Sequence, residues 1–508
     1  MSFNLATMLR ETALAEPGKD FLRFPTGSLT YAEVDEASGR VAAALRARGH
    51  RPGDKVALQL PNVPEFVSAY FGILKAGLVL VPLNPLLKAG EIAYHLADSD
   101  ARLLITGAFS AGEALAALAE VPDVAAVVVG AEFDTAAWPA GTGAFDDLLA
   151  AEGDDEVHPG AADDTAVLLY TSGTTGRPKG AELSHFSLYM TCTIGGQTFG
   201  TEPSDVVLAV LPFFHVYGLS SILNGAVRHG RTVSVVPRFE PKAVLEAIER
   251  DRVTIMAGVP TMYHALAAAD SSGYDTSSLR IGSSGGAAIP ERVLRSFEEK
   301  FGIPVLEGYG LSESSSTATV NPGADRRKLL SIGKPIWGVQ LRIVDEQDRQ
   351  LPPGAEHVGE IVLRGHNITK GYYKRPEETA KAFRGGWFHT GDLGYVDEDG
   401  FAFVVDRKKD LVIRGGYNVY PREVEELLYT HPAVAEAAVL GEPDDRLGEE
   451  VVAVVSLKPG AVAEPEEIVA WAKERIAAYK YPRRVRIIDE LPKGPTGKIA
   501  KLLLRENS

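Results

Sequence analysis

Short apolar runs alternate with longer amphipathic stretches along the first part of the chain. The runs 55–60 and 79–83 have the length and apolar content of strands, and the segment 65–75 between them has the spacing of a helix. The alternation continues with strand-like runs at 101–106, 124–129, 166–170, 206–211, 232–237 and 253–257 and a helical stretch at 111–120. Strands that alternate with helices predict an α/β fold in which helices cover parallel sheets.

After residue 335 the pattern of polar and apolar positions changes. The segments 339–344 and 359–364 alternate like antiparallel strands, and 387–410 is again rich in strand and turn residues, which predicts a smaller β-rich subdomain. The remainder predicts a small α+β unit, with an amphipathic stretch at 422–429, strands at 433–440 and 451–457, and a helix at 465–480. We therefore expect a large N-terminal domain over 1–408 and a C-terminal domain over 409–508.

Composition and charge narrow the classes of protein. The 508 residues are enough for at least two domains, and the formal net charge of −16, with no long Lys/Arg run, argues against a nucleic-acid partner. No window approaches the ~18 consecutive apolar residues of a membrane span, and 1–17 does not resemble a signal peptide, so we expect no stable membrane insertion. Cys192 is the only cysteine and is expected to be a packing residue. Since a single cysteine can form no intrachain disulfide, we expect the protein in the reducing cytoplasm. The acidic stretch 139–164 is expected to be an exposed connection.

Hydroxyl side chains, glycines and two cations are concentrated in one short segment after the predicted strand 166–170. It reads Tyr170-Thr171-Ser172-Gly173-Thr174-Thr175-Gly176-Arg177-Pro178-Lys179-Gly180. Glycines let the backbone approach a ligand closely, N–H groups can point inward, and a lysine supplies a point charge, so the segment predicts a polyphosphate-binding loop. Its spacing is not that of a Walker A motif. A solvated Ser/Gly turn is the alternative.

Two further glycine-rich segments predict a nucleotide site. In Gly308-Tyr309-Gly310-Leu311-Ser312-Glu313-Ser314, the glycines flank an aromatic ring that could stack on a flat base, and Glu313 could bind a Mg²⁺ ion that bridges phosphates. The small residues at 283–288 precede an amphipathic helix at 291–301 and would let a planar base lie against the backbone. Ordinary glycine turns are the alternative for both.

Single polar residues in three other motifs are candidates for the chemistry. Asp392 follows Gly391, where a carboxylate could accept bonds from both hydroxyls of a ribose or could simply form a turn. Lys498 follows a Pro/Gly-rich loop that would present its charge rigidly, although a lysine near a terminus is ordinarily exposed. His215 lies in the aromatic run 211–218, where a core histidine is the usual outcome.

Taken in order, these motifs resemble those of the adenylate-forming (ANL) superfamily, which includes acyl-CoA synthetases, peptide-synthetase adenylation domains and firefly luciferase. The resemblance extends from 29–33 to Lys498. It implies a large N-terminal domain that binds ATP and the acyl group, and a small mobile C-terminal domain that carries the catalytic lysine.

The resemblance also implies a role for each matching residue. The catalytic residues would be Lys498, Glu313, Thr174 and His215, and the metal ligands Thr174 and Glu313. The nucleotide and CoA would contact Thr171, Ser172, Gly173, Thr174, Thr175, Gly176, Lys179, Gly286, Ala287, Ala288, Glu307, Gly308, Tyr309, Gly310, Leu311, Ser312, Asp392, Arg407, Gly416 and Lys498. The acid would contact His215, Val216, Tyr217, Gly218, Val259, Met262, Gly308 and Gly310. Lys409 would be the hinge between the domains.

The implied reaction has two steps that share one site. A carboxylic acid and MgATP give acyl-AMP and pyrophosphate, and the thiol of CoA then displaces AMP. The chain ends soon after Lys498 without a fused carrier domain, which favours free CoA as the acceptor. Whether the protein is a monomer or a homodimer stays open.

The residues near the acid site favour an uncharged acyl group. Relatives that activate amino acids carry an Asp in the stretch that matches 212–215, and relatives that activate malonate carry an Arg at the position of Gly308; this chain has neither. Burying a second carboxylate without a partner would cost several kcal/mol. We therefore expect a medium- to long-chain fatty acid. An aryl or 4-coumarate-type acid is the main alternative, followed by a luciferase-like oxygenase and by a catalytically silent nucleotide-binding protein.

Overall fold

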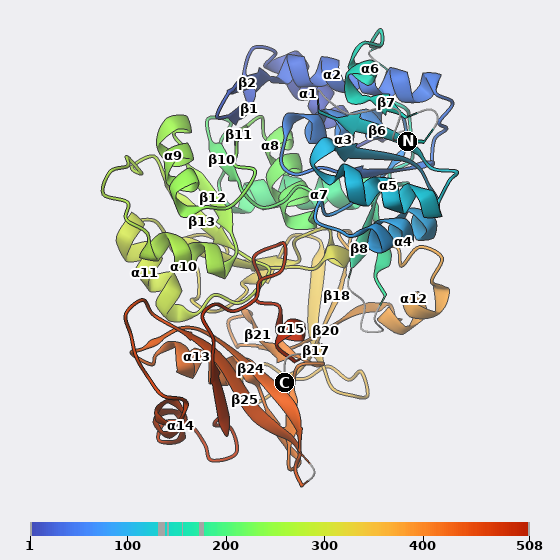
Figure 1. Cartoon of the computed structure of the whole chain (residues 1–508). Helices are drawn as coiled ribbons and strands as arrows, with labels where there is room; N and C mark the ends of the chain where they lie inside the picture. Colours follow the sequence, from blue (N-terminus) through green and yellow to red (C-terminus); the bar gives the residue numbers. More distant parts are fainter. Residues whose placement is uncertain are drawn as a thin grey trace.

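The computed structural model describes residues 3–130, 138–139, 142–154, 156–171, 177–444 and 446–505. In these residues, two helix-covered sheets make up the upper body of the molecule in Figure 1, a β-rich sheet lies beside them, and the C-terminal residues form a separate body below. The predicted α/β architecture with a β-rich subdomain and a small α+β unit is confirmed. In the part of the chain described, no helix has the length and apolar character needed to cross a membrane.

The sheet that leads into the predicted phosphate loop runs in the order β7-β6-β5-β3-β4-β8-β9. Its strands are β3 Lys55–Gln59, β4 Val79–Pro82, β5 Ala101–Gly107, β6 Ala125–Val129, β7 Gly143–Ala144, β8 Thr165–Thr171 and β9 Lys179–Ser184. Every pair in it is parallel except β8–β9. The helices between these strands are α3 Pro64–Lys75, α4 Ala89–Ser99, α5 Ala111–Glu120 and α6 Phe145–Leu149. Parallel strands need crossover connections, which are usually helices, and this sheet has them. The βαβ pattern predicted from the sequence is therefore confirmed for this sheet.

The second large sheet runs in the order β16-β15-β14-β13-β12-β10-β11-β1-β2. Its strands are β1 Asp20–Phe24, β2 Gly27–Thr30, β10 Val206–Ala209, β11 Thr232–Val235, β12 Ile255–Gly258, β13 Ile281–Ser284, β14 Val305–Tyr309, β15 Thr319–Val320 and β16 Lys334–Pro335. Its helical segments are α1 Thr7–Ala15, α2 Tyr31–Ala47, α7 His185–Thr198, η3 Tyr217–Asn224, α8 Gly225–Arg228, α9 Pro241–Asp251, α10 Pro260–Ala268 and α11 Glu291–Phe301. A short η4 Ser312–Ser314 follows β14, so the aromatic motif stands at the carboxyl end of an inner strand of this sheet.

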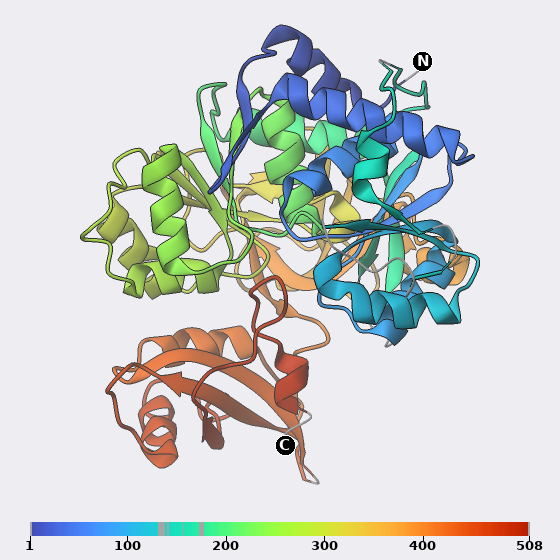
Figure 2. The same ribbon diagram turned by 45° about the horizontal axis from the view of Figure 1, so that its top comes forward.

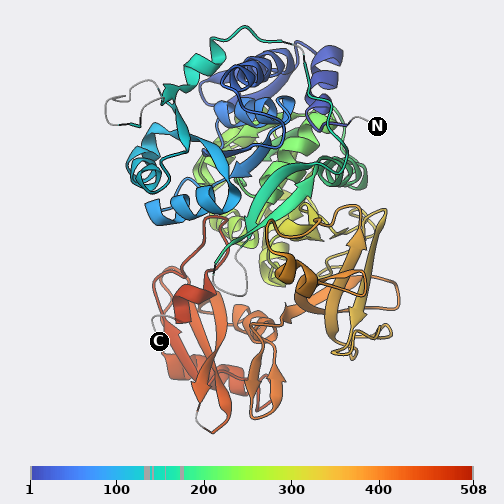
Figure 3. The same cartoon turned by 90° about the vertical axis from the view of Figure 1, so that its right-hand side faces the viewer.

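The β-rich sheet is antiparallel and runs β17-β18-β20-β19, with β21 paired to β20. Its elements are β17 Val339–Val344, β18 Gly359–Gly365, α12 Pro376–Ala382, β19 Phe383–Arg384, β20 Trp387–Val396 and β21 Ala402–Arg407. Figure 3 shows this sheet beside the C-terminal body. Because β20 and β21 pair in the register Asp392↔Arg407, two of the predicted site residues are neighbours across one ladder.

The C-terminal body is a sheet in the order β23-β22-β25-β24, with β26 paired to β25. Its elements are β22 Val412–Arg414, β23 Tyr417–Val419, α13 Pro421–Tyr429, β24 Val434–Asp444, β25 Gly448–Leu457, α14 Pro465–Lys473, β26 Arg484–Ile487 and α15 Lys501–Arg505. The predicted boundary falls between the end of β21 and the start of β22 and stays a prediction.

Two local expectations were wrong. The helix expected over 465–480 ends at Lys473, after which the chain turns and Ala472 accepts backbone hydrogen bonds from Arg475 and Ile476. The stretch 139–164 is not simply an exposed connection, because α6 within it buries Phe145 and Leu148 at an i, i+3 spacing against α2.

A loop of the C-terminal body reaches into the N-terminal one. Figure 2 shows this loop, in dark red, rising from the lower body to the upper one. The Thr261 hydroxyl at the start of α10 donates a hydrogen bond of 2.7 Å to the carbonyl of Gly497. Arg292 on α11 donates to the carbonyl of Tyr429 at 3.1 Å. These contacts hold the two bodies in the orientation that inserts the Lys498 loop.

Candidate active site

The strands that flank the predicted phosphate loop form an antiparallel pair. β8 and β9 pair from Thr165↔Ser184 to Thr171↔Lys179. Thr171 and Lys179 therefore stand opposite each other at the end of the ladder that adjoins the predicted phosphate loop. The other predicted loop residues, Ser172, Gly173, Thr174, Thr175 and Gly176, lie outside the described residues.

Glu313 is brought to this end of the β8–β9 pair from the segment after β14. Its Oε1 accepts hydrogen bonds from the hydroxyls of Thr171, at 3.2 Å, and of Tyr372, at 2.9 Å. Within the described residues, no hydrogen bond or ion pair involves Oε2. No group of three or more His, Cys, Asp or Glu able to hold a metal occurs in this part of the chain. One carboxylate whose Oε2 has no partner among the described residues fits Mg²⁺, which is commonly held by one or two carboxylates together with substrate phosphates.

Tyr309, Asp392 and Arg407 form the predicted nucleoside site. The Tyr309 hydroxyl donates to Asp392 Oδ2 at 2.6 Å, and Arg407 Nε lies 3.3 Å from Asp392 Oδ1. Burial raises the pKa of Asp392, while the charge of Arg407 and the Tyr309 hydroxyl oppose that shift. The structure thus assembles from β14, β20 and β21 three residues that the sequence singled out separately.

Lys498 enters the same space from the C-terminal body. Its Cε would lie 2.8 Å and its Nζ 3.2 Å from a Cβ built on Gly286, which has φ +81°. Burial, with a smaller contribution from the charge of Arg407, lowers the pKa of Lys498 to about 8 against the opposing charge of Asp392. Gly286 and Ala287 are exposed and Ala288 is half-buried, so this predicted adenine-binding backbone is open for contact.

His215 lies close to Lys498 and is uncharged. Burial and, to a smaller extent, the charge of Lys498 lower the pKa of His215 to about 3. Its Nδ1 accepts a hydrogen bond of 3.3 Å from the Tyr217 backbone N–H, which leaves the ring proton on Nε2. A neutral imidazole that presents an N–H can orient an acid, but it carries no charge of its own in the ordinary pH range.

Tyr217 forms a wall with the glycines of the two nucleotide-binding segments. A Cβ on Gly285 would lie 3.1 Å from the Tyr217 ring and 3.5 Å from the carbonyl of Gly308. The Tyr217 hydroxyl shares a hydrogen bond of 3.0 Å with that of Ser283. One helical turn further on, three hydroxyls lie together: Ser221 is 2.6 Å from Ser316 and 3.4 Å from Thr317. These groups around Tyr217 are uncharged.

The other residues predicted to contact the acid have different surroundings. Val216 and Gly218 are buried, and a Cβ on Gly218 would collide with the Pro212 carbonyl. Val259 and Met262 contact the C-terminal loop, since a Cβ on Gly497 would lie 3.1 Å from Val259 and 3.8 Å from Met262. Both therefore sit where the Lys498 loop enters.

The segment around Tyr309 is tightly fitted. A Cβ on Gly310 would collide with the carbonyl of Ser316, and one on Gly308 would lie 3.2 Å from that of Thr319. Leu311 and Ser312 are half-buried next to Glu313. Only glycine fits at position 310, because the chain doubles back on itself there.

Glu307 is buried, and its carboxyl interacts with groups away from Tyr309. The backbone N–H groups of Ile289 and Leu330 donate to it, and the charge of Arg422 acts on it. Burial, the largest effect, raises the pKa of Glu307 to about 7. The Glu307 carboxyl therefore lies within the electrostatic reach of Arg422, near the boundary between the two bodies.

Gly416 and Lys409 lie outside the assembled site. Gly416 has φ +84° with no atom within 4 Å of a Cβ built there. The adjacent Tyr417 is 61% exposed and stacks on Tyr479 at 4.9 Å. Lys409 is exposed in the turn after β21. The structure therefore has the Lys498 loop inserted and the Gly416 loop facing solvent.

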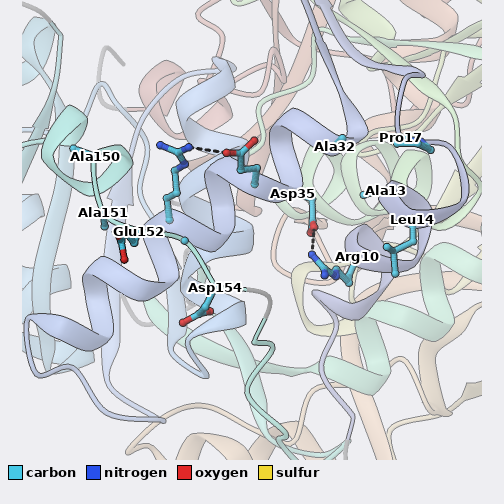
Figure 4. A pocket seen from close by; sticks show the side chains of 13 residues that line it. Arg10, Ala13, Leu14, Pro17, Ala32, Asp35, Ala150, Ala151, Glu152 and Asp154 are labelled. Carbon is cyan, nitrogen blue, oxygen red and sulfur yellow. Dashed lines mark hydrogen bonds and ion pairs between the residues drawn. The ribbon is translucent and has the colours of Figure 1, made fainter.

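Sequence reasoning missed Thr261 and Tyr372. Both act through contacts with residues more than fifty positions away, to Gly497 and to Glu313 respectively. A separate groove of about 700 Å³ involves none of the predicted site residues. Figure 4 shows Arg10 pointing at Asp35 in this groove, which lies over α1 and α2.

A lysine from the C-terminal body thus reaches into a body built on two helix-covered, largely parallel sheets. Residues 9–373 match the family described as AMP-binding enzyme, and residues 423–498 match the AMP-binding enzyme C-terminal domain. The chain belongs to this family, the adenylate-forming superfamily.

Individual relatives extend over nearly the whole chain. It is 37% identical to the long-chain-fatty-acid–CoA ligase of Bacillus subtilis (strain 168), over 99% of this chain and 94% of that protein. It is 40% identical to a feruloyl-CoA synthase of an Amycolatopsis species, over 96% of each chain. The crystal structure of the anthranilate CoA ligase AuaEII in complex with anthranoyl-AMP matches with a TM-score of 0.93 and 32% identity, over 100% of this chain and 97% of that one. The protein is an AMP-forming acid–thiol ligase, which uses ATP to join an acyl or aryl acid to CoA through an acyl-AMP.

Proposed function

We propose that the acid is a medium- to long-chain fatty acid and that the reaction requires Mg²⁺. The observation that carries the proposal is the uncharged surrounding of Tyr217, where His215 is neutral and the neighbouring polar groups are hydroxyls. A second carboxylate there would lack a cationic partner, whereas each CH₂ buried contributes about 0.8 kcal/mol. The likeness to a long-chain-fatty-acid–CoA ligase supports the same conclusion.

In the first half-reaction, the chain's residues bind the nucleoside and orient the carboxylate of the acid against the α-phosphate. Tyr309 offers its ring to the adenine, while Asp392 accepts hydrogen bonds from the ribose and releases the Tyr309 hydroxyl that it now binds. Lys498 places its ammonium between the carboxylate of the acid and the α-phosphate, which lowers the repulsion between two anions in the transition state. Glu313 and Thr174 would hold Mg²⁺, which supplies positive charge to the phosphates.

In the second half-reaction, the Lys498 loop leaves and the Gly416 loop enters. Lys409 is where the backbone would turn, since it stands in the exposed turn between β21 and β22. A loop that reaches the site only after rotation can line the path of the CoA thiol without competing with Lys498. We place the division of domains at 408 and 409, and the enzyme in the cytoplasm, where both ATP and CoA are available.

An aryl acid is the second candidate, and a specific observation favours it. The hydroxyls of Ser221, Ser316 and Thr317 lie one helical turn beyond Tyr217 and could bind a polar substituent on a ring. The wall formed by Tyr217 and Gly285 would suit a flat molecule. Relatives named for feruloyl-CoA and anthranilate make this candidate worth testing.

The deciding experiment measures pyrophosphate release with MgATP for acids from acetate to palmitate, together with malonate, 4-coumarate, ferulate and anthranilate, with and without CoA. Preference for one length of saturated acid, with turnover only when CoA is present, supports the proposal. Preference for the ring acids replaces it with the aryl candidate. Substituting Ser221→Ala sharpens the result, because it should reduce activity only with acids that carry a polar substituent.

A further inference from the structure

Tyr372 connects two parts of the active site that lie far apart in the sequence. Its hydroxyl donates to Glu313 Oε1 at 2.9 Å, and Lys179 Nζ lies 4.7 Å from the centre of its ring. The half-buried Tyr372 side chain therefore contacts the Glu313 carboxylate through its hydroxyl and the Lys179 ammonium through its ring.

The backbone around Tyr372 is itself held against β9. The chain pairs with β9 through an isolated bridge between Ala181 and Tyr372. Glu182 N–H donates to the Gly371 carbonyl at 3.0 Å, and Tyr373 N–H donates to the Gly180 carbonyl at 2.8 Å. Because β9 also begins with Lys179, the position of Tyr372 is fixed relative to the phosphate-binding end of the ladder.

The segment that contains Tyr372 also forms a hydrogen bond with the backbone of Glu313. Thr369 N–H donates to the Glu313 carbonyl at 2.7 Å, and the Thr369 hydroxyl donates to the Glu182 carbonyl at 2.8 Å. Thr369 thus holds the main chain of Glu313, and Tyr372 holds its carboxylate.

We propose that Tyr372 is a positioning residue that fixes Oε1 of Glu313, so that Oε2 faces the site where Mg²⁺ binds with the phosphates of ATP. The proposal rests on the metal-binding role proposed for Glu313. Thr171 and Tyr372 donate to the same oxygen, which sets the rotation of a side chain that would otherwise sample several rotamers.

The test compares Tyr372→Phe with Tyr373→Phe. Tyr373 is a matched control, since it is the next residue and its hydroxyl donates to Asp100 at 2.7 Å, away from Glu313. Two quantities are measured on each full-length variant: the affinity for ATP with EDTA and with Mg²⁺ by calorimetry, and the Mg²⁺ concentration that half-saturates pyrophosphate release.

We expect Tyr372→Phe to raise the half-saturating Mg²⁺ concentration about 10- to 100-fold, as loss of one hydrogen bond to a charged group predicts. Affinity for ATP in EDTA should stay unchanged, because the ring that faces Lys179 remains. Tyr373→Phe should change neither quantity. Tyr372→Leu removes the ring as well and should weaken binding of metal-free ATP too.

An unchanged Mg²⁺ requirement in Tyr372→Phe would overturn the proposal, as would an equal loss of ATP affinity with and without the metal. Glu313→Gln separates this outcome from failure of the assigned metal site. If Glu313→Gln shifts the Mg²⁺ requirement and Tyr372→Phe does not, only the role of Tyr372 fails. If neither shifts it, the metal role of Glu313 fails as well.

Discussion

Thr261 and Gly497 are joined by a hydrogen bond of 2.7 Å that crosses from the N-terminal body to the loop carrying Lys498. Gly497, with φ +79°, also packs between Val259 and Met262. A single hydroxyl on α10 therefore holds the residue next to the proposed catalytic lysine, and it does so only in the orientation that the structure has.

Removing this hydroxyl should slow the first half-reaction alone. In Thr261→Val, we expect acyl-AMP formation to fall about 3- to 10-fold, since one neutral hydrogen bond contributes about 1 kcal/mol. Thioester formation from supplied acyl-AMP should not fall, because that step does not use this orientation. Thr12→Val is a matched control, as its hydroxyl donates to the Val227 carbonyl at 3.0 Å away from the loop. Equal slowing of both steps would contradict the prediction.

Lys498→Ala should nearly abolish acyl-AMP formation and spare thioester formation from supplied acyl-AMP. The ammonium lies next to Gly286 and within the field of Asp392, where it can act on the reacting phosphate and carboxylate. Single-turnover assays of the two steps make the comparison. A loss of both would mean that Lys498 acts on the fold or on CoA transfer instead.

The rate of adenylation should fall as the pH rises through about 8. Lys498 has its pKa lowered to about 8 by burial, and only the protonated form carries the charge that the step needs, so activity declines on the alkaline side. In Lys498→Arg the guanidinium stays charged, so residual activity should lose this decline. The measurement is kcat/KM for pyrophosphate release between pH 6 and 10. An unchanged alkaline limb in the arginine variant would assign the titration to another group.

His215 should contribute no acidic limb. With its pKa lowered to about 3, the imidazole stays neutral between pH 5 and 7. We expect His215→Ala to lower kcat/KM for the acid about 10-fold, because one orienting N–H is lost, without moving the pH dependence between 5 and 7. An acidic limb that disappears in this variant would show that His215 titrates as a base.

Gly416→Leu should affect only the second half-reaction. The side chain would point into open space in the observed orientation, so adenylation should be normal, whereas the proposed thiol path would be blocked and thioester formation should fall more than 10-fold. The left-handed φ of +84° costs about 1–2 kcal/mol of stability in a residue with a Cβ. Gly400→Leu carries the same strain, at φ +79° and with open space, in the turn between β20 and β21. Only a selective loss in Gly416→Leu supports the thiol-path role.

Local patterns predicted most of the fold because periodicity and turn residues are properties of short segments. The strands β3, β4 and β5 and the helices α3 and α5 lie where apolar spacing placed them. The end of α14 was missed, since Ala477 and Ala478 continue the helical composition beyond the point where the chain turns. Motif resemblance predicted which residues would meet, and the structure brings together Tyr309, Asp392 and Arg407.

Contacts that form only when distant segments pack together leave no pattern in the local sequence. Tyr372 is one of two adjacent tyrosines, and nothing in the sequence distinguishes the hydroxyl that reaches Glu313 from the one that reaches Asp100. Thr261 lies between Val259 and Met262, which the resemblance placed at the acid site, but nothing local marks its hydroxyl. Its bond to Gly497 depends on how the two bodies are oriented, which spacing along a chain does not encode.

The burial of Lys498 has a thermodynamic consequence for ligand binding. An ammonium group whose pKa is about 8 is partly deprotonated in mildly alkaline solution. Bringing the phosphates of ATP beside it favours the charged form and raises that pKa, so binding draws a proton from the medium. The measured heat of nucleotide binding near pH 8 should then vary with the ionisation enthalpy of the buffer, and Lys498→Ala should abolish that dependence. The proposed role of Lys498 thus predicts that the enzyme's affinity for its nucleotide depends on pH before any bond is formed.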